Sequence, residues 1–247
     1  AFDSYKLTHI SDIHSGSFDD EEKISYGIDL INKQESDVIL FTGDIVNNTA
    51  DEMTPWIPLF SKLKAKDGKF SVLGNHDYGE YTRWKTIEEK EQNFQAIKDI
   101  HPKIGFNLLL NDSVYLEKET DKIALVGVEN WGTRFKKVGN LNLASSKIEN
   151  HDFKILMSHD PSHWEQEVKN HSNNYHLTLS GHTHGMQFGI EIPGIKWSPV
   201  QYIYKHWAGV YKEFGKYINV NRGFGFLAFP GRVGIWPEIT VITLKKK

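Results

Sequence analysis

Short apolar runs that end in polar residues recur along the chain, and they predict buried β-strands. Each run is rich in Val, Ile, Leu or Phe, and each is followed at once by a polar cluster. Such strands are expected over residues 7–10, 38–41, 70–73, 155–157 and 177–179. Buried strands are therefore expected in both halves of the chain.

Two segments of the first half carry apolar residues at helical spacing. Over residues 19–35, Ile24, Ile28 and Ile31 recur on one side, behind acidic residues that suit a helix N-terminus. Over residues 82–100, apolar side chains lie along one side among charged ones, as in an amphipathic helix. The first half is therefore expected to run β-α-β-α-β.

From residue 106 the pattern changes to short strands separated by turns. Strands over 108–110, 114–116 and 123–128, with turns at 111–112 and 120–121, predict an antiparallel meander. Further strands are expected over 187–190, 210–214, 217–220 and 239–244. No repeat or linker separates these segments, so we expect two packed sheets flanked by helices.

The composition is that of one globular domain without a broadly basic surface. The chain has 247 residues, 39% hydrophobic and 13% aromatic, which is enough for one core, so a single domain over residues 1–247 is expected. A formal charge of −3 gives no general attraction to nucleic acid or anionic lipid, but leaves a local patch open. Because cysteine is absent, any metal site must use nitrogen and oxygen ligands.

The two ends of the chain leave its localisation open. The sequence has no run of about 18 apolar residues that would span a bilayer. It starts at Ala1 with a predicted strand close behind, so removal of a leader or an N-terminal anchor is one alternative. For the closing Lys245, Lys246 and Lys247, a short solvated tail is favoured over contact with an anionic membrane.

Polar clusters follow five of the predicted strands at the point where each strand ends. They are Asp12-Ile13-His14, Gly43-Asp44, Gly74-Asn75-His76-Asp77, Ser158-His159-Asp160 and Gly181-His182-Thr183-His184-Gly185. Ligands in layered α/β proteins gather at the carboxyl ends of strands. We therefore expect the five clusters to meet in one crevice.

The spacing within two of these clusters suits metal ligation. In an extended chain, residues two apart face the same side, so Asp12 and His14 can hold one ion together. His182 and His184 can do the same, or reach two neighbouring ions if the backbone turns. The alternative, that the histidines are structural and the other residues cap turns, has to apply five times independently. A metal site is the favoured interpretation.

The order of the blocks, DxH, GD, GNHD, H and GHTH, resembles the calcineurin-like metallophosphoesterase superfamily. The motifs run from Asp12 to His184 and cover most of the chain. The resemblance implies an α+β fold, a four-layer α/β/β/α sandwich of two mixed β-sheets flanked by helices. It also implies two divalent metal ions that share Asp44 as a bridging ligand. Asp12, His14 and His184 would complete the first site, and Asn75, His159 and His182 would complete the second.

His76 and Asp77 are the expected catalytic residues of such a centre. A phosphodiester repels hydroxide, and two metal ions counter this by drawing charge from the phosphoryl oxygens and activating a bridging water near neutral pH. His76, as imidazolium, would stabilise or protonate the leaving oxygen, a step of roughly 10²–10⁴-fold, with Asp77 orienting its imidazole by a hydrogen bond. The resemblance implies direct attack of the bridging hydroxide, without a phosphoenzyme. Mn²⁺ is the favoured ion, and Zn, Fe, Co and Ni also fit the ligands.

The last quarter of the sequence is similar to one bacterial branch of that superfamily. The similar segments are 194–199, 207–211, 219–223 and 236–239. Many members of the branch carry an N-terminal membrane anchor, and some hydrolyse the pyrophosphate of UDP-2,3-diacylglucosamine. Asn47 and Met186 stand where an acid and a glycine are frequent in the branch, but neither is an expected ligand.

The substrate contacts predicted from the sequence are Trp197, Arg222 and Arg232. Trp197 opens a segment dense in aromatic residues, 197–217, which forms either a rim for a lipid or aromatic leaving group or part of the core. Each arginine can reach a substrate phosphate with its planar fork, or form a surface ion pair instead.

The expected function is hydrolysis of phosphomonoesters, phosphodiesters or pyrophosphates, with diesters and anhydrides favoured because His76 can assist a poor leaving group. One alternative is a UDP-2,3-diacylglucosamine pyrophosphatase of lipid A synthesis. Another is a non-catalytic scaffold on the same fold, against which every expected ligand is present. A nuclease would need a basic groove, so no nucleic-acid partner is expected. Peripheral membrane association and the oligomeric state stay open.

Overall fold

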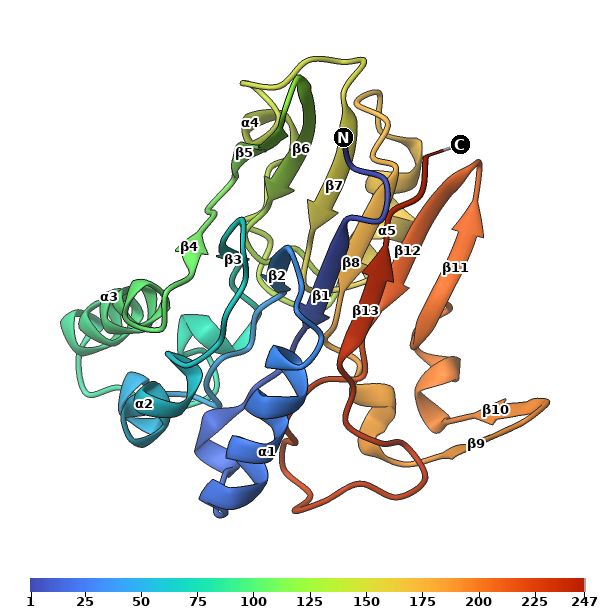
Figure 1. Cartoon of the computed structure of the whole chain (residues 1–247). Coiled ribbons are helices and arrows are strands. Elements are labelled where there is room, and N and C mark those ends of the chain that lie inside the picture. The colour runs from blue at the N-terminus through green and yellow to red at the C-terminus, as the bar shows by residue number, and fades with distance from the viewer. Residues whose placement is uncertain (247) are drawn as a thin grey trace.

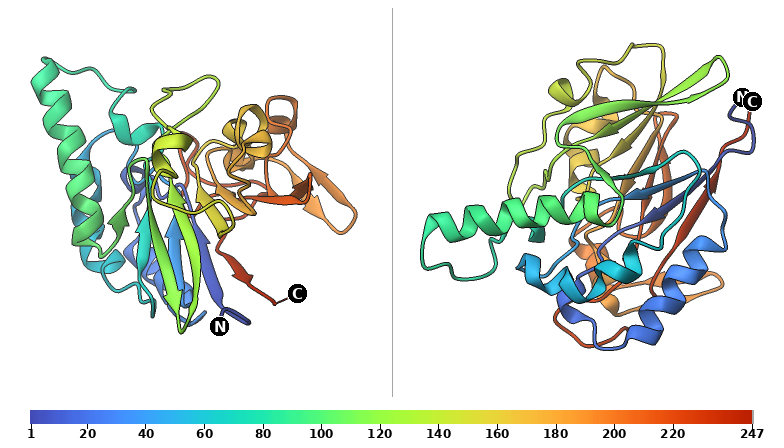
Figure 2. Two further views of the ribbon diagram at one scale, coloured as in Figure 1. Left: turned by 90° about the horizontal axis from the view of Figure 1, so that it is seen from above. Right: turned by 60° about the vertical axis from the view of Figure 1, so that its left-hand side comes forward.

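Two β-sheets that pack face to face form the centre of the computed structural model, which describes residues 1–246 (Figures 1 and 2). The first sheet has the strand order β13-β1-β2-β3-β4, and the second has the order β11-β12-β8-β7-β6-β5. The first contains β1 (Lys6–Ile10), β2 (Val38–Phe41), β3 (Lys69–Ser71), β4 (Asn107–Leu108) and β13 (Thr240–Thr243). The second contains β5 (Asp112–Lys118), β6 (Asp121–Gly127), β7 (Phe153–Met157), β8 (Leu177–Ser180), β11 (Gly209–Glu213) and β12 (Lys216–Val220).

Both sheets are mixed. Strands β1 to β4 run parallel, and β13 is antiparallel to β1. In the second sheet β6, β7, β8 and β12 run parallel, and the edge strands β5 and β11 run antiparallel to their neighbours. The carboxyl ends of the parallel strands gather at one end of the sandwich, the lower end in Figure 1.

Helices cover the outer face of each sheet. They are α1 (Glu21–Asn32), α2 (Ile57–Phe60) and α3 (Ile87–Lys103) on the first sheet and α4 (Leu141–Ala144) and α5 (Ser162–Gln166) on the second. Helix α1 starts where the Asp20 carboxylate accepts a hydrogen bond from the Lys23 N–H at 3.1 Å, and it buries Ile24, Ile28 and Ile31. Short 3-10 helices lie in the loops at Ser15–Ser17, Ala50–Trp56, His76–Tyr78, Val168–Asn170, His184–Gln187 and Pro199–Tyr202. The predicted α+β sandwich, with helices outside two mixed sheets, is confirmed.

Apolar side chains from both sheets fill the space between them. Leu7 and Leu40 of the first sheet share a cluster with Leu125, Ile155 and Leu179 of the second, and all five are fully buried. Burying one side chain of this size stabilises a fold by about 1.5–3 kcal/mol. This shared core fixes the two sheets relative to each other, and with them the loops that follow the strands.

The antiparallel meander predicted over residues 108–128 is wrong at its first strand. β4 belongs to the first sheet, where it runs parallel to β3 and pairs Asn107 with Phe70, and the antiparallel hairpin consists of β5 and β6. Between β4 and β5 the chain crosses from the first sheet to the second. The crossing contains the buried Leu109 and Asn111, which has a φ of 53°. A turn signal at 111–112 does not distinguish a hairpin from such a crossing.

Two other predicted elements are displaced along the chain. The second helix begins at Ile87 rather than near 82, because the Thr86 hydroxyl accepts a hydrogen bond from the Glu89 N–H and caps it there. The strand predicted over 187–190 is β9 (Ile190–Ile192), which pairs with β10 (Ile195–Trp197) in a separate hairpin. Gln187 precedes that strand with a φ of 54°, which is incompatible with an extended chain.

Candidate metal centre

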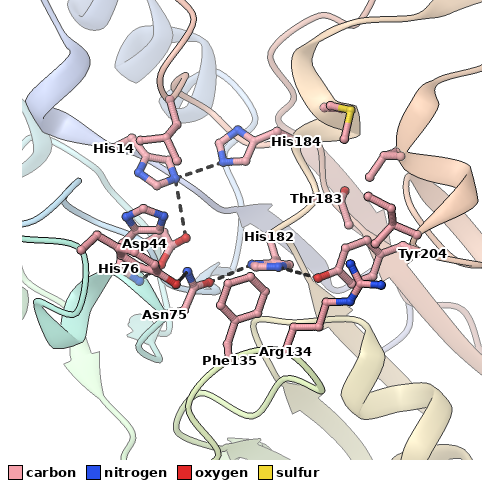
Figure 3. Close-up of a pocket in the computed structure, with 15 residues that line it drawn as sticks. His14, Asp44, Asn75, His76, Arg134, Phe135, His182, Thr183, His184 and Tyr204 are labelled. Carbon is pink, nitrogen blue, oxygen red and sulfur yellow. Dashed lines mark hydrogen bonds and ion pairs between the residues drawn. The ribbon is translucent and has the colours of Figure 1, made fainter.

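The loops after β1, β2, β3, β7 and β8 bring the predicted polar clusters into one site. Figure 3 shows His14, Asp44, Asn75, His76, His182 and His184 of these clusters gathered around the cavity. This site contains the seven side chains expected to ligate metal, Asp12, His14, Asp44, Asn75, His159, His182 and His184. They come from distant segments of the sequence; His14 and His184, for example, are 170 residues apart. The shared sheet edge is therefore what assembles the site.

Backbone strain is concentrated at these residues. Asp12, His14, Asp44, His182 and His184 all have positive φ, between 48° and 70°. Left-handed backbone at a non-glycine residue costs on the order of 1 kcal/mol, and strain of this kind clusters at functional sites. Ordinary turns do not explain why a positive φ occurs at five of the seven expected metal ligands.

Glycines next to the strand ends allow the two carboxylates to lie against the backbone. A Cβ on Gly74 would come within 2.2 Å of Asp44 Oδ1, and one on Gly181 would come within 2.2 Å of Asp12 Oδ2. Gly43, with a φ of 97°, would bring a Cβ within 2.3 Å of the Gly74 nitrogen. No larger residue fits at these positions without moving the backbone or a carboxylate.

The first group of ligand atoms consists of Asp12, His14 and His184. His184 Nε2 lies 3.0 Å from His14 Nε2 and 3.3 Å from Asp12 Oδ1. His14 Nε2 also lies 3.6 Å from Asp44 Oδ2. Asp12 and His14 are fully buried, so three donor atoms converge on a point that is closed to solvent on one side.

The second group consists of Asp44, His159, His182 and Asn75. Asp44 Oδ2 lies 3.1 Å from His159 Nε2, and His182 Nδ1 lies 2.8 Å from Asn75 Oδ1 and 3.3 Å from His159 Nε2. The same Asp44 oxygen thus approaches both groups of ligand atoms.

Electrostatics in the site depend on the two carboxylates among the expected ligands, Asp12 and Asp44, which are both buried. Burial raises the pKa of Asp44, but the charges of His159 and His76 outweigh it and hold that pKa well below its usual range. Burial lowers the pKa of His159, but the charge and hydrogen bond of Asp44 outweigh it and raise that pKa to about 10. Burial lowers the pKa of His14 to about 3. The carboxylates therefore stay ionised and depend on nearby positive charge.

The donor set fits divalent metal ions. His159 Nδ1 lies 2.7 Å from the Thr42 carbonyl oxygen, so this nitrogen carries the proton and Nε2 is the ligand atom that faces Asp44. His182 Nε2 lies 2.8 Å from the Tyr204 hydroxyl, which leaves Nδ1 for a metal. Nitrogen and oxygen donors of this kind suit first-row transition metals better than Ca²⁺ or Mg²⁺.

The hydrogen bond expected between Asp77 and His76 is replaced by other contacts. His76 Nδ1 lies 2.7 Å from the Asn47 carbonyl oxygen. The Asp77 carboxylate instead accepts hydrogen bonds from the backbone N–H groups of Asp44, Ile45 and Gly74 at 2.8–2.9 Å. Asp77 therefore holds the loop that carries Asp44, and a backbone carbonyl orients His76. The DxH and GNHD patterns do not reveal this, because they contain no information on which backbone groups lie nearby.

A cavity of about 310 Å³ opens onto the ligand atoms. Beside them it is lined by residues that the sequence did not single out as site residues, among them Tyr81, Arg134, Phe135 and Tyr204 (Figure 3). The Tyr81 hydroxyl accepts a hydrogen bond from Asn75 Nδ2 at 2.8 Å. Only Tyr204 had a signal in the sequence, as part of the aromatic segment.

The three predicted substrate contacts lie outside the lining of this cavity. Arg222 forms ion pairs with Glu191 and Glu238. Arg232 donates hydrogen bonds to backbone carbonyl oxygens, including that of Arg222 at 2.8 Å, and its Nη2 lies 3.4 Å from His184 Nδ1. Trp197 ends β10, with its ring 6.4 Å from that of Phe188. The structure thus places both arginines in networks within the protein.

Two packed mixed sheets with carboxylate, amide and imidazole side chains gathered at their strand ends are the arrangement of a metal-dependent phosphoester hydrolase, the class to which the sequence comparisons also assign this chain. The family model described as calcineurin-like phosphoesterase matches residues 5–186, and the chain belongs to this family.

Relatives in sequence cover almost the whole chain. The uncharacterized metallophosphoesterase YkuE of Bacillus subtilis (strain 168) is 32% identical over 250 residues, which is 99% of this chain and 80% of that protein. The phosphodiesterase YaeI of Escherichia coli (strain K12) is 26% identical, over 97% of this chain and 82% of YaeI. A transmembrane protein with metallophosphoesterase domain from Danio rerio is 24% identical over 98% of this chain but only 53% of its own length. In residues 1–246 of the present chain, helices fall short of the length and apolar character that crossing a bilayer requires.

Solved structures share the fold. The phosphopantetheinyl hydrolase PptH of Mycobacterium tuberculosis superimposes with a TM-score of 0.51 at 11% identity, over 88% of this chain and 89% of PptH. The sulfate thiohydrolase SoxB of Thermus thermophilus gives a TM-score of 0.56, also at 11% identity, over 99% of this chain and 57% of SoxB. At this identity the likeness concerns the fold alone.

Proposed function

We propose that this protein hydrolyses phosphodiesters or phosphoric anhydrides at a centre of two divalent metal ions, with Mn²⁺ as the favoured metal. The observation that carries the proposal is the place of Asp44. One oxygen of its carboxylate lies 3.1 Å from His159 Nε2 and 3.6 Å from His14 Nε2, one nitrogen from each group of ligand atoms. A carboxylate in that place can bridge two ions about 3.5–4 Å apart.

The chain's residues divide into two ligand sets. Asp12, His14 and His184 would hold one ion, and Asn75, His159 and His182 would hold the other, with Asp44 shared between them. When bound, the ions supply positive charge to the phosphoryl oxygens and lower the pKa of a water molecule so that it can attack phosphorus. The positive φ values and the backbone contacts of Asp77 keep the ligand atoms in place before substrate arrives.

His76 is the group placed to assist the leaving oxygen. The Asn47 carbonyl oxygen holds its Nδ1, and the ring lines the cavity, so Nε2 is left to face substrate. In the imidazolium form this nitrogen would donate a proton to the leaving oxygen. An alkoxide leaving group gains most from such a donor, and this favours alkyl diesters over esters with an activated leaving group.

A turnover assay with substrates of different classes tests the proposal. Bis-p-nitrophenyl phosphate, p-nitrophenyl phosphate and a nucleotide-lipid pyrophosphate would be compared, with Mn²⁺, Zn²⁺, Fe²⁺, Co²⁺ and Ni²⁺ added one at a time. We expect metal-dependent turnover that favours diesters or anhydrides and is lost in Asp44→Asn. Absence of turnover under all these conditions would contradict the proposal and favour a non-catalytic scaffold.

A second candidate is hydrolysis of a nucleotide-lipid pyrophosphate such as UDP-2,3-diacylglucosamine. The observation that favours it is the mixed lining of the cavity, where the cationic Arg134 accompanies the apolar Val200, Ile203 and Leu227. A second phosphate can pair with a guanidinium group, and an acyl chain with the apolar wall. Arg134→Ala should then reduce kcat/KM on the pyrophosphate more than on bis-p-nitrophenyl phosphate. Equal loss on both substrates would contradict this candidate.

A further inference from the structure

The β9–β10 hairpin projects from the sandwich (Figures 1 and 2). In this antiparallel pair, Ile192 lies opposite Ile195, and Ile190 lies opposite Trp197. Because side chains two apart on a strand share a face, these four residues form one apolar face of the hairpin. The three isoleucines are 50–55% exposed.

The other face of the hairpin is polar, and its side chains, although exposed, reach back to the body of the protein. Glu191 and Lys196, which are opposite each other, form this face. Glu191 pairs with Arg222, while Lys196 donates a hydrogen bond to the Ala208 carbonyl oxygen and its Nζ lies 4.7 Å from the centroid of the Trp207 ring. A hairpin on a protein in water normally has the reverse arrangement, apolar inward and polar outward. The inversion favours an apolar phase, rather than water, outside the hairpin.

More exposed apolar side chains lie at the base of the hairpin. Phe188 is 50% exposed, and its backbone pairs with that of Val233, which is 48% exposed. Trp236, in the same loop as Val233, is 73% exposed. Met186, two residues before Phe188, lines the cavity of the metal centre. We call these side chains, together with those of the hairpin face, the apolar rim: Phe188, Ile190, Ile192, Ile195, Trp197, Val233 and Trp236.

A basic loop lies beside the same cavity. Arg134 lines the cavity, and Lys136 and Lys137 follow it on an exposed loop. Of the cations on this loop, Lys136 pairs with Glu80 at 3.2 Å, and Glu80 also pairs with Lys90 at 3.0 Å. The loop therefore carries local positive charge, although the whole chain has a formal charge of −3.

We propose that the apolar rim and the basic loop dock this protein on the surface of an anionic phospholipid bilayer, with the cavity of the metal centre turned towards the lipid headgroups. Isoleucines on a projecting hairpin can enter the outer acyl region, and tryptophan rings such as Trp236 sit well at the boundary with water. Each cation of the basic loop near an anionic surface adds attraction. The inference stands apart from the proposed chemistry, since no rim residue is an expected metal ligand.

A second copy of the chain is the competing occupant of the apolar rim. A stable dimer buries about 800 Å² on each partner. The apolar rim supplies seven side chains, and the three isoleucines of the hairpin are about half buried already. A bilayer, in contrast, accepts a small apolar insertion when cations accompany it. The charge beside the cavity therefore favours the bilayer.

Co-sedimentation with large vesicles tests the docking. The purified chain should sediment with vesicles that contain phosphatidylglycerol, and less with pure phosphatidylcholine. The double variant Ile192→Ser/Ile195→Ser should lower the partition coefficient by roughly tenfold or more, because two buried side chains are lost from the acyl region. Trp236→Ala should also weaken vesicle binding, and it leaves the sequence of the hairpin unchanged. Turnover of bis-p-nitrophenyl phosphate should be unchanged in both, since these residues lie outside the cavity.

Phe214→Ala is the matched control, because Phe214 is 74% exposed in the turn before β12, at the end of the sheet away from the metal centre. It should bind vesicles like the unchanged chain. Failure of the unchanged chain to sediment with anionic vesicles, or equal partition of the hairpin and control variants, would overturn the proposal. So would a dimer in analytical ultracentrifugation that the double variant dissociates, without any vesicle binding. Missing turnover with normal vesicle binding would count against the proposed hydrolysis and leave the docking intact.

Discussion

Two clusters of acidic and imidazole side chains in this protein have similar composition but different charge balance. At the strand ends, Asp12 and Asp44 are fully buried, and their closest ionisable partners are histidines. The second cluster contains Glu165, His206 and Glu213, and its ligand atoms also lie within 4.8 Å of one another. By distance alone, both clusters could hold a metal ion.

The two clusters differ in that lysines pair with the carboxylates of the second one. Lys169 Nζ lies 2.8 Å from Glu165 and 3.2 Å from Glu213, and Lys205 also pairs with Glu213. These ammonium groups neutralise the carboxylates permanently near neutral pH. At Asp44 the positive charge comes from imidazoles, which can give up their protons to a metal ion. Because the compensating charge can leave only at the strand ends, we expect a metal ion there and none between Glu165 and Glu213.

The largest predicted effect comes from removing the shared carboxylate. Asp44→Asn should lower turnover of bis-p-nitrophenyl phosphate by about three orders of magnitude or more, because the two proposed ions would lose their common carboxylate. Glu213→Gln is the matched change in the second cluster and should leave turnover intact. Circular dichroism would verify that both variants fold. Similar turnover of Asp44→Asn and Glu213→Gln would contradict the claim that the two clusters differ in function.

The next effect separates catalysis from metal binding within the first cluster. His76→Ala should lower kcat by roughly 10²–10⁴-fold while the metal content, measured by elemental analysis, stays the same. The loss should be larger for a diester with an alkoxide leaving group than for bis-p-nitrophenyl phosphate, because the poorer leaving group needs the proton more. A loss that does not depend on the leaving group would contradict the role given to His76.

A smaller effect is expected where Tyr204 supports a ligand. Its hydroxyl lies 2.8 Å from His182 Nε2, so Tyr204→Phe should weaken binding of Mn²⁺ by about tenfold by freeing the imidazole. Tyr202→Phe, on the same loop but 79% exposed, is the control and should bind Mn²⁺ normally. Calorimetric titration of the metal-free variants gives both affinities, and equal values would refute the supporting role.

The smallest effect concerns the stability of the second cluster. The Lys205 hydrogen bond, with further help from Lys169, lowers the pKa of Glu213 from 4.5 to about 2. A carboxylate with a lowered folded-state pKa stabilises the fold above its ordinary pKa and loses that contribution as the pH falls towards the lowered value. Glu213→Gln should therefore lower the free energy of unfolding by about 1 kcal/mol at pH 7, and the difference should shrink below pH 4.5. A difference that stays constant down to pH 3 in thermal melts would show that the ion pairs contribute nothing.

The sequence was sufficient for the parts of this molecule whose signals are local. The apolar runs of β1, β2, β7 and β8 and the spacing of Ile24, Ile28 and Ile31 predict elements that the structure contains. The polar residues directly after the strands could be expected to meet, because parallel strands share their carboxyl ends.

Contacts between distant segments were beyond the reach of local signals. The pairing of β4 with β3 depends on the core between the sheets rather than on the turn at 111–112. The contact of His76 with the Asn47 carbonyl oxygen, and the place of Arg134 in the cavity, follow from loop paths that no spacing encodes. The inverted hairpin is visible only when the register of β9 and β10 shows which side chains share a face.

Anomalous X-ray scattering from crystals grown with Mn²⁺ is the most direct test of the central claim. The account predicts two manganese peaks about 3.5–4 Å apart, one on each side of the Asp44 carboxylate, and none between Glu165 and Glu213. A single peak that Asp44 does not touch, or a peak at the Glu165 cluster with none at Asp44, would contradict it.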